Sequence, residues 1–324
     1  MEKVEKNFYD NMDYWGGQHK PFVFLIDFEC KEPLLFSFED SKRNLLWQTP
    51  FHSNFLKGEP TTKIEVWEIE PAPFQIYKAG FNLIQKHIQK GDTFLLNYTQ
   101  PCKIKTNLSL EEIFYLSSAP YKILLKDRFT CFSPEIFVRI EEGKISSFPM
   151  KGTIEATAKN AEELILKDTK EIAEHNTIAD LIRNDLSMVA DNVKVEKFRY
   201  LDEIKTNRKR LLQVSSKITG ELPGGYCNNI GAIISKMLPA GSISGAPKPK
   251  TLEVIRKAEN YPRGYYTGIF GYFDGKNLDS CVLIRYIENQ NGQLVYKSGG
   301  GITFMSDCET EYNEMINKVY VPIT

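Results

Sequence analysis

Short hydrophobic runs separated by polar and glycine-containing segments dominate the first half of the chain. Apolar runs of this length between turn residues are typical of buried strands, whereas apolar residues at intervals of three and four are typical of helices. The strands predicted in this way are Phe22–Phe28, Lys63–Ile69, Thr93–Thr99, Tyr121–Leu125 and Ile136–Ile140. Helical spacing between them predicts helices at Phe74–Gln89 and Leu110–Leu116.

The second half opens with a long helical pattern from Asn160 to Asp191, followed by shorter elements. Further helices are predicted at Gly231–Met237 and Pro249–Ala258, then strands at Tyr266–Tyr272, Ser280–Tyr286 and Leu294–Lys297, and a terminal helix. Asp274-Gly275 and Asn291-Gly292 join the late strands by tight turns, which favour antiparallel pairing. With no linker or repeat in view, we expect one α+β domain over residues 1–324, with helices packed on large sheets.

Composition narrows the class of protein. A chain of 324 residues can bury a substantial core, and its net charge of −1 gives no global field for nucleic acid or an anionic membrane. The first residues are too polar for a signal peptide, and no apolar run is long enough to span a bilayer. The 6 cysteines form no CxxC pair, which indicates reduced thiols. These features predict a cytoplasmic protein without nucleic-acid or membrane partners.

The last part of the chain combines a glycine run with two carboxylates and a lysine. Ser298–Thr303 contains three consecutive glycines, and Glu311, Glu314 and Lys318 follow at helical positions i, i+3 and i+7, on one face. Two stacked carboxylates repel each other unless a cation or basic group lies between them. Backbone amides of a flexible glycine loop can surround a carboxylate. This combination predicts an enzyme that holds a metal ion and an anion together.

A second acidic pair, Glu171 and Glu174, has the same i, i+3 spacing in the predicted long helix. Taken alone, such a pair is more often a solvated helix face. Together with Glu311 and Glu314 it favours Mg²⁺, which is usually held by one or two carboxylates plus waters and substrate oxygens. The other carboxylates would then support the ligands.

Three further residues have two possible interpretations each. Arg285 is placed in the strand that begins at Cys281, where it either points to solvent or clamps a carboxylate with two hydrogen bonds. Lys151 is either a solvated residue beside a Gly-Thr turn or, if buried among apolar groups, a nucleophilic amine. Glu135, which follows Pro134, is either an exposed turn residue or a general acid.

Several motifs in one order resemble a known family. They are Pro149–Thr153, Ile178–Asp185, Leu238–Lys248, Arg263–Gly268 and Gly299–Ile302. Together they resemble the chorismate-utilising enzymes, which include anthranilate synthase component I, aminodeoxychorismate synthase component I, isochorismate synthase and salicylate synthase. The resemblance extends from about Gly91 to Lys318. It implies an α/β sandwich of two large antiparallel sheets with helices outside, completed by a shortened N-terminal region at about residues 1–90.

The resemblance also implies roles for individual residues. Glu174 and Glu314 match Mg²⁺ ligands, and Glu171 and Glu311 match the acidic residues beside them. The remaining matched positions contact the substrate chorismate, chiefly its two carboxylates: Arg285, Tyr266, Gly299, Gly300, Lys318, Thr153 and Gln213.

Two positions favour one branch of the family. Leu95 stands where the members that add water to chorismate have a lysine base, and Lys151 stands where anthranilate synthases have alanine. Both features resemble the aminodeoxychorismate synthases, in which the lysine is proposed to attack C2 of chorismate as the C4 hydroxyl leaves. Ammonia then attacks C4 and expels the lysine. Glu135 matches the general acid that protonates the departing hydroxyl.

The chain also departs from the family pattern. Gln213 replaces a histidine, and no Leu-Leu-Glu-Ser motif for tryptophan feedback is present. No cysteine lies in a Gly-x-Cys-x-Gly motif, so ammonia is expected from a separate glutamine amidotransferase, and a separate lyase would form 4-aminobenzoate for folate synthesis. Anthranilate synthase component I and a non-catalytic chorismate-binding subunit remain alternatives.

Overall fold

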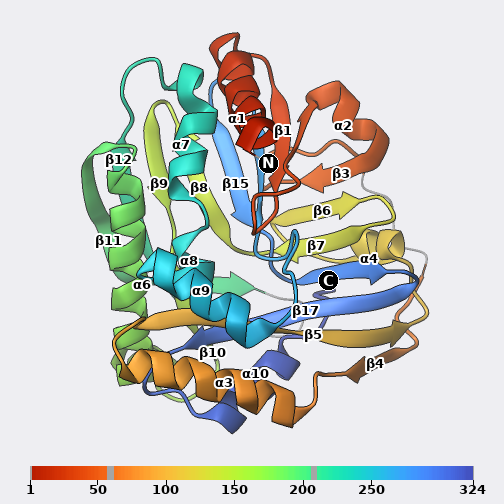
Figure 1. Cartoon of the computed structure of the whole chain (residues 1–324), viewed down its shortest axis with the longest axis vertical. Helices are drawn as coiled ribbons and strands as arrows, with labels where there is room; N and C mark the ends of the chain where they lie inside the picture. Colours follow the sequence, from red (N-terminus) through yellow and green to blue (C-terminus); the bar gives the residue numbers. More distant parts are fainter. Residues whose placement is uncertain (1, 57–61, 206–209, 324) are drawn as a thin grey trace.

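Two antiparallel sheets form the body of the molecule, with helices around them (Figure 1). The computed structural model describes residues 2–56, 62–205 and 210–323. Within these residues the first sheet has nine strands in the order β10-β12-β9-β8-β15-β14-β1-β2, with β11 paired to β12. The second sheet has eight strands in the order β13-β5-β17-β16-β7-β6-β3, with β4 paired to β5. The predicted α+β sandwich of two large antiparallel sheets is confirmed.

The strands of the first sheet are β1 (Phe22–Ile26), β2 (Leu34–Ser37), β8 (Ile136–Glu141), β9 (Lys144–Ser147), β10 (Met150–Glu155), β11 (Asp191–Lys205), β12 (Arg210–Glu221), β14 (Ile269–Phe273) and β15 (Leu278–Val282). Those of the second are β3 (Leu45–Gln48), β4 (Trp67–Glu70), β5 (Leu95–Thr106), β6 (Tyr121–Leu125), β7 (Phe129–Ser133), β13 (Gly245–Ala246), β16 (Tyr286–Gln290) and β17 (Gln293–Ile302).

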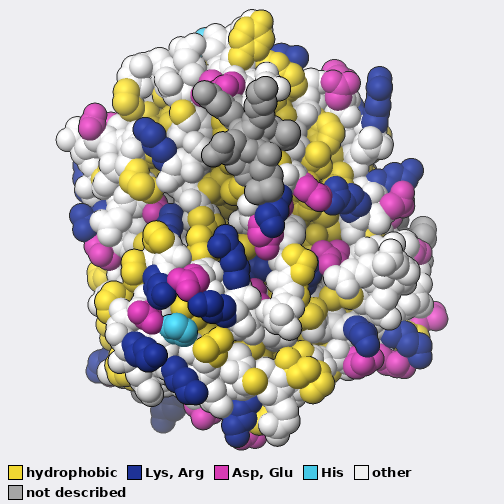
Figure 2. Space-filling model, in the orientation of Figure 1, with side chains coloured by type: hydrophobic (Ala, Val, Ile, Leu, Met, Phe, Trp, Pro, Cys, Tyr) yellow, Lys and Arg dark blue, Asp and Glu magenta, His cyan; other side chains and the backbone are white. Residues whose placement is uncertain are grey.

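The helices are α1 (Glu2–Gly17), α2 (Phe38–Asn44), α3 (Phe74–Gln89), α4 (Leu110–Leu116), α5 (Ala161–Lys167), α6 (Thr169–Ser187), α7 (Ile230–Met237), α8 (Gly241–Ser244), α9 (Lys248–Glu259) and α10 (Cys308–Asn317), with a 3₁₀ turn at Tyr226–Asn229. Of the helices in the described ranges, none is both long and apolar enough to cross a membrane. On the face shown in Figure 2, basic and acidic side chains are interspersed.

Strand β1 shows why a continuous apolar run forms a strand here. Phe22, Phe24 and Ile26 face one hydrophobic cluster, whereas Val23 and Leu25 face another, because successive side chains point to opposite sides of a sheet. The strand pairs with β14 on one side and β2 on the other, so it is an interior strand of its sheet. Both of its faces are buried. Strands β3 and β4, also from the first 90 residues, pair with β6 and β5 in the second sheet.

Two predictions about elements are wrong in ways that affect the site. The helix expected from Asn160 to Asp191 is divided at Asp168, which ends α5 and caps α6 by accepting a hydrogen bond from the Glu171 amide at 2.9 Å. The strand expected at Ser280–Tyr286 is also divided. It ends at Val282, and Arg285 has a left-handed backbone with φ of 55° immediately before β16.

Other strand predictions need smaller corrections. The strand expected at Tyr266–Tyr272 begins at Ile269, which leaves Tyr266 in the preceding turn. Strand β5 starts at Leu95 rather than Thr93 and continues to Thr106. The strand expected at Lys63–Ile69 begins only at Trp67 and ends at Glu70. The predicted bounds of α3, α4 and β6 are those of the structure.

Candidate active site

A cavity of about 760 Å³ collects the predicted site residues from both sheets and from helices α6 and α10. This volume lies in the range usual for small-molecule sites. The predicted residues that line it are Glu135, Lys151, Glu171, Glu174, Gln213, Tyr266, Arg285, Gly299, Gly300, Glu311, Glu314 and Lys318. Thr153 belongs to β10, but its side chain lies outside the described residues. The structure therefore brings these side chains together, and their individual roles remain predictions.

The glycine run forms part of a strand, and the expectation of a flexible loop is wrong. Residues 298–302 of β17 continue the pairing with β5, whereas β16 reaches only Lys297. From Ser298 onward, β17 therefore pairs on one side only among the described strands. Residues 298–301 of β17 line the cavity. A Cβ on Gly299 would lie 2.3 Å from the Tyr98 carbonyl oxygen, so the close approach to β5 requires glycine there.

The absence of side chains also brings this strand close to charged groups. A Cβ on Gly300 would lie 3.6 Å from both Glu311 Oε2 and Lys318 Nζ. One on Gly301 would lie 3.4 Å from Lys151 Nζ and 3.3 Å from Leu95 Cδ1. The strand backbone is thus surrounded by the ionisable groups from which the sequence predicted a metal and anion site.

The four carboxylates predicted for the metal site all line the cavity, Glu171 and Glu174 from α6 and Glu311 and Glu314 from α10. Glu174 Oε2 is 2.9 Å from Lys151 Nζ, and Glu314 Oε1 is 2.7 Å from Lys318 Nζ. The described residues contain no group of three or more His, Cys, Asp or Glu side chains already gathered as metal ligands. Hard carboxylate oxygens from two helices at one cavity still fit Mg²⁺, because waters and substrate oxygens usually supply most of its ligands.

Lys151 lies at a bulge of β10 where Gly152 has a φ of 73°. Its side chain is 26% exposed, toward a cavity rich in carboxylates. Burial lowers the pKa of the amine, but the carboxylates of Glu174, Glu171 and Glu314 more than offset this, so the pKa of Lys151 is raised. A neutral amine was expected only if Lys151 were buried among apolar groups, and the structure instead surrounds it with carboxylates. The amine is held as a cation by Glu174.

Glu135 differs from Lys151 in its hydrogen-bond partner, which is a neutral hydroxyl and not a charged group. Its backbone is fixed by hydrogen bonds with Ser133 Oγ at 3.1 Å and with the Val282 amide at 3.1 Å. Ser242 Oγ donates a hydrogen bond to Oε1 at 2.6 Å. Burial raises the pKa of Glu135, and the Ser242 hydrogen bond and the charges of Lys151 and Lys318 only partly oppose this rise. Its carboxyl group therefore keeps a proton to higher pH than an exposed glutamate.

Arg285 and Lys318 connect the end of α10 to the sheet. Arg285 Nη1 donates to the Lys318 carbonyl oxygen at 2.6 Å, and the guanidinium lies 4.7 Å from the Tyr320 ring centre. Lys318 Nζ donates to the Gly299 carbonyl oxygen at 3.1 Å. Tyr266 is buried at the same cavity. These cationic and phenolic groups can bind a substrate carboxylate beside residues 298–302 of β17, which we call the glycine strand.

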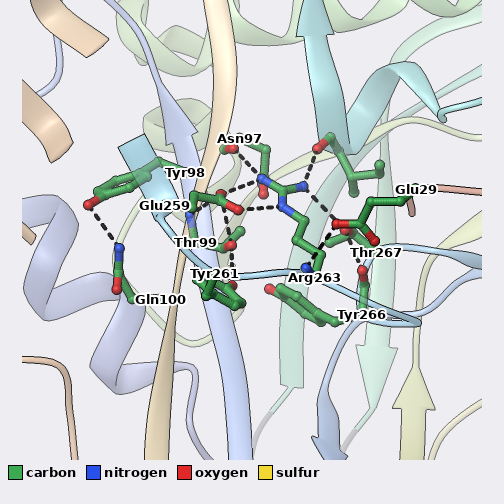
Figure 3. A network of polar contacts seen from close by, with 11 residues as sticks. Glu29, Asn97, Tyr98, Thr99, Gln100, Glu259, Tyr261, Arg263, Tyr266 and Thr267 are labelled. Atoms are coloured by element: carbon green, nitrogen blue, oxygen red, sulfur yellow. Dashed lines mark hydrogen bonds and ion pairs between the residues drawn. The ribbon is translucent and has the colours of Figure 1, made fainter. Parts of the chain in front are cut away.

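The sequence did not predict a buried ion pair between Arg263 and Glu259, which contacts residues that line the cavity (Figure 3). Arg263 donates to Glu259 from Nε at 2.8 Å and from Nη2 at 2.6 Å. The guanidinium also donates to the carbonyl oxygens of Asn97 at 2.6 Å and Ile243 at 3.0 Å, and to Thr267 Oγ1 at 3.2 Å. A buried charge pair is tolerated when its remaining donors are satisfied. In the sequence, Arg263 opens one of the family motifs, and its i, i+4 spacing from Glu259 was the signal for the pair.

Comparisons with known proteins show which proteins this chain is similar to. A family model described as chorismate binding enzyme matches residues 29–324. An uncharacterized PabA-like protein from Haemophilus influenzae is 48% identical, over 99% of this chain and 98% of its own length. Anthranilate synthase component 1 from Aquifex aeolicus is 33% identical over 81% of this chain, which spans only 57% of that protein. The menaquinone-specific isochorismate synthase of Escherichia coli shares the fold, with a TM-score of 0.73 at 15% identity, over 97% of this chain and 80% of that structure.

Proposed function

Because this chain belongs to the chorismate-binding enzyme family, we propose that it converts chorismate and ammonia to 4-amino-4-deoxychorismate. The observation that carries the proposal is the placement of Lys151 and Glu135 on one cavity with the glycine strand. Leu95 supports it, because the leucine beside Gly301 cannot activate water. The PabA-like description of the Haemophilus relative points to the same branch.

In this reaction, residues of the chain bind the substrate, form and break the covalent bond to it, and supply the proton. Arg285, Tyr266 and the backbone of β17 bind the carboxylates of chorismate. The Lys151 amine, once neutral, forms a bond to C2, both ring double bonds shift by one position, and the C4 hydroxyl leaves as water with a proton from Glu135. Ammonia then bonds to C4, the double bonds shift back, and the bond between C2 and Lys151 breaks to release the amine. The new C4 nitrogen loses one proton, which restores the proton that Glu135 gave to the hydroxyl. Covalent catalysis of this kind replaces one difficult displacement by two easier ones.

Glu174 and Glu314 would hold Mg²⁺ in this proposal, with Glu171 and Glu311 supporting them. Bound Mg²⁺ would anchor a substrate carboxylate and would compete with Lys151 and Lys318 for the carboxylates that these lysines now contact. The ammonia would come from a glutamine amidotransferase partner, and a separate lyase would convert the product to 4-aminobenzoate.

Product analysis tests the proposal directly. Purified protein would be incubated with chorismate, Mg²⁺ and an ammonium salt, and the products separated and identified by mass. We expect a product that keeps the enolpyruvyl group, has an amine in place of the hydroxyl, and is converted to 4-aminobenzoate by added lyase. Anthranilate with free pyruvate would instead assign the chain to the second candidate, which the 33% identity to anthranilate synthase component 1 favours.

Lys151→Ala separates covalent catalysis from the alternatives. The change should remove most of the aminating activity and leave chorismate binding nearly intact, since Arg285 and β17 still hold the carboxylates. Full activity in the variant would rule out the lysine adduct. Binding of chorismate without any turnover by the unaltered chain would favour the non-catalytic subunit.

A further inference from the structure

We propose that Ser242 is a positioning residue that decides which oxygen of Glu135 carries the proton delivered to the substrate. Its hydroxyl donates to Oε1, so the acid proton is left on Oε2. This inference rests on the proposed function only in that Glu135 serves there as the general acid. The hydrogen bond itself is a feature of the structure.

The contact has the geometry that such a role needs. A protonated carboxyl group has one O–H donor oxygen and one oxygen that can only accept. At 2.6 Å, the bond from Ser242 occupies the accepting position on Oε1. The backbone of Glu135 is fixed on both sides, by Ser133 and Val282, so the carboxyl cannot easily leave its partner.

Ser242 is itself held firmly, because α8 is anchored from two directions. Arg263 Nη1 donates to the Ile243 carbonyl oxygen at 3.0 Å, which ties α8 to the buried ion pair (Figure 3). On the other side α8 packs closely on α6, since a Cβ on Gly241 would lie 2.8 Å from Leu181 Cγ and 2.9 Å from Asp185 Oδ2. The position of the Ser242 hydroxyl is therefore set by the fold.

The charged groups around Glu135 explain why an orienting donor matters. Lys151 and Lys318 share the cavity with Glu135 and favour its ionised form, whereas burial favours the neutral form. The Ser242 hydroxyl also favours the ionised form. Its removal should therefore have two effects. The carboxyl proton loses its fixed position, and ionisation of Glu135 shifts to higher pH.

A matched pair of substitutions tests the hydroxyl without changing shape. Ser242→Thr keeps the donor, and Ser242→Val replaces it by a methyl group of similar size. Following chorismate consumption, we expect kcat to fall about 10-fold in the valine variant, within the contribution of a general acid, with KM for chorismate unchanged. The fall in rate at high pH should occur at a higher pH than in the parent protein. The threonine variant should keep most of the activity and the original limb. Equal activity and equal pH profiles in the two variants would overturn the proposal.

A double-mutant cycle asks whether Ser242 acts through Glu135. In a Glu135→Gln background, the change from serine to valine should cause no further loss, because no acid proton remains to be positioned. The same loss in both backgrounds would show that Ser242 acts by another route, and would also overturn the proposal. The cycle uses chorismate consumption, so it remains decisive if the product proves not to be 4-amino-4-deoxychorismate.

An infrared measurement gives a readout independent of turnover. The carbonyl stretch of protonated Glu135 can be identified as the band that disappears in Glu135→Gln. Loss of the hydrogen bond to Oε1 should move this band to higher frequency in Ser242→Val and leave it in place in Ser242→Thr. An unshifted band in the valine variant would contradict the proposed contact even if the protein proved inactive toward chorismate.

Discussion

Lys151 and Glu135 share a cavity but keep their protons for different reasons. Neighbouring carboxylates raise the pKa of Lys151, whereas burial raises the pKa of Glu135. Both environments therefore favour the protonated form of the group, a charged amine for Lys151 and a neutral carboxyl for Glu135. In the proposed reaction Glu135 would donate its proton, whereas Lys151 would first have to lose one. Groups whose environments differ in this way usually have distinct acid and base roles.

The raised pKa of Glu135 predicts a pH dependence. A general acid works only while protonated, so the rate of chorismate consumption should fall as pH rises through this pKa. Glu135→Gln should lower the rate about 10²- to 10⁴-fold and remove this limb of the pH profile. Glu141→Gln is the matched control. Glu141 is exposed at the end of β8, the strand that follows Glu135, and its change should leave the profile unchanged. A Glu135→Gln enzyme that retains both its rate and the limb would exclude the acid role.

Elements were predicted well where their signal is local. The bounds of α3 and α4 follow from apolar residues at helical spacing, and those residues indeed face the core. The break at Asp168 was also readable, since an Asp three residues before Glu171 is a helix-capping pattern. It was missed because the hydrophobic period continues across it.

Elements that depend on distant partners could not be predicted in the same way. Glycine is a poor strand former, so the run at Gly299–Gly301 suggested a loop, and only pairing with Asn97–Thr99 makes it a strand. The site residues were identified through family motifs, and their spacing alone left their roles open. The roles of Ser242 and Arg263 depend on burial and on contacts across the fold, which no local pattern records.

The glycine strand yields a paired prediction. Gly299→Ala should destabilise the protein by about 1–3 kcal/mol, because the added methyl would meet the Tyr98 carbonyl oxygen at 2.3 Å. Gly300→Ala should leave stability nearly unchanged, since its methyl has no neighbour closer than 3.6 Å, but it should weaken chorismate binding from within the cavity. Thermal unfolding and calorimetric binding measure the two effects. A Gly299→Ala protein as stable as the parent would contradict the pairing of β17 with β5.

At the scale of the molecule, the cavity depends on both sheets. The first sheet supplies Lys151 and Gln213, the second supplies the glycine strand, and α6 and α10 add carboxylates. The first 90 residues contribute strands to each sheet, through β1 and β2 in one and β3 and β4 in the other. We therefore expect the chain to unfold in one cooperative step, with far-ultraviolet circular dichroism and tyrosine fluorescence changing together. Two separate transitions would instead indicate that residues 1–324 contain more than one folding unit.

Ligands that join these parts should stabilise the whole chain. If Glu174 on α6 and Glu314 on α10 hold one Mg²⁺ with a chorismate carboxylate, each ligand should tighten the binding of the other, because such coupling is reciprocal. Saturation at a hundred times Kd adds about 2.7 kcal/mol to the free energy of unfolding. The melting temperature should therefore rise more with Mg²⁺ and chorismate together than the two separate increases combined, and Glu314→Gln should abolish this excess. Sodium chloride at matched ionic strength is the control. A chorismate-induced increase that is unaffected by EDTA would mean that the substrate binds without the metal, and Lys151 and Lys318 would then remain the partners of Glu174 and Glu314.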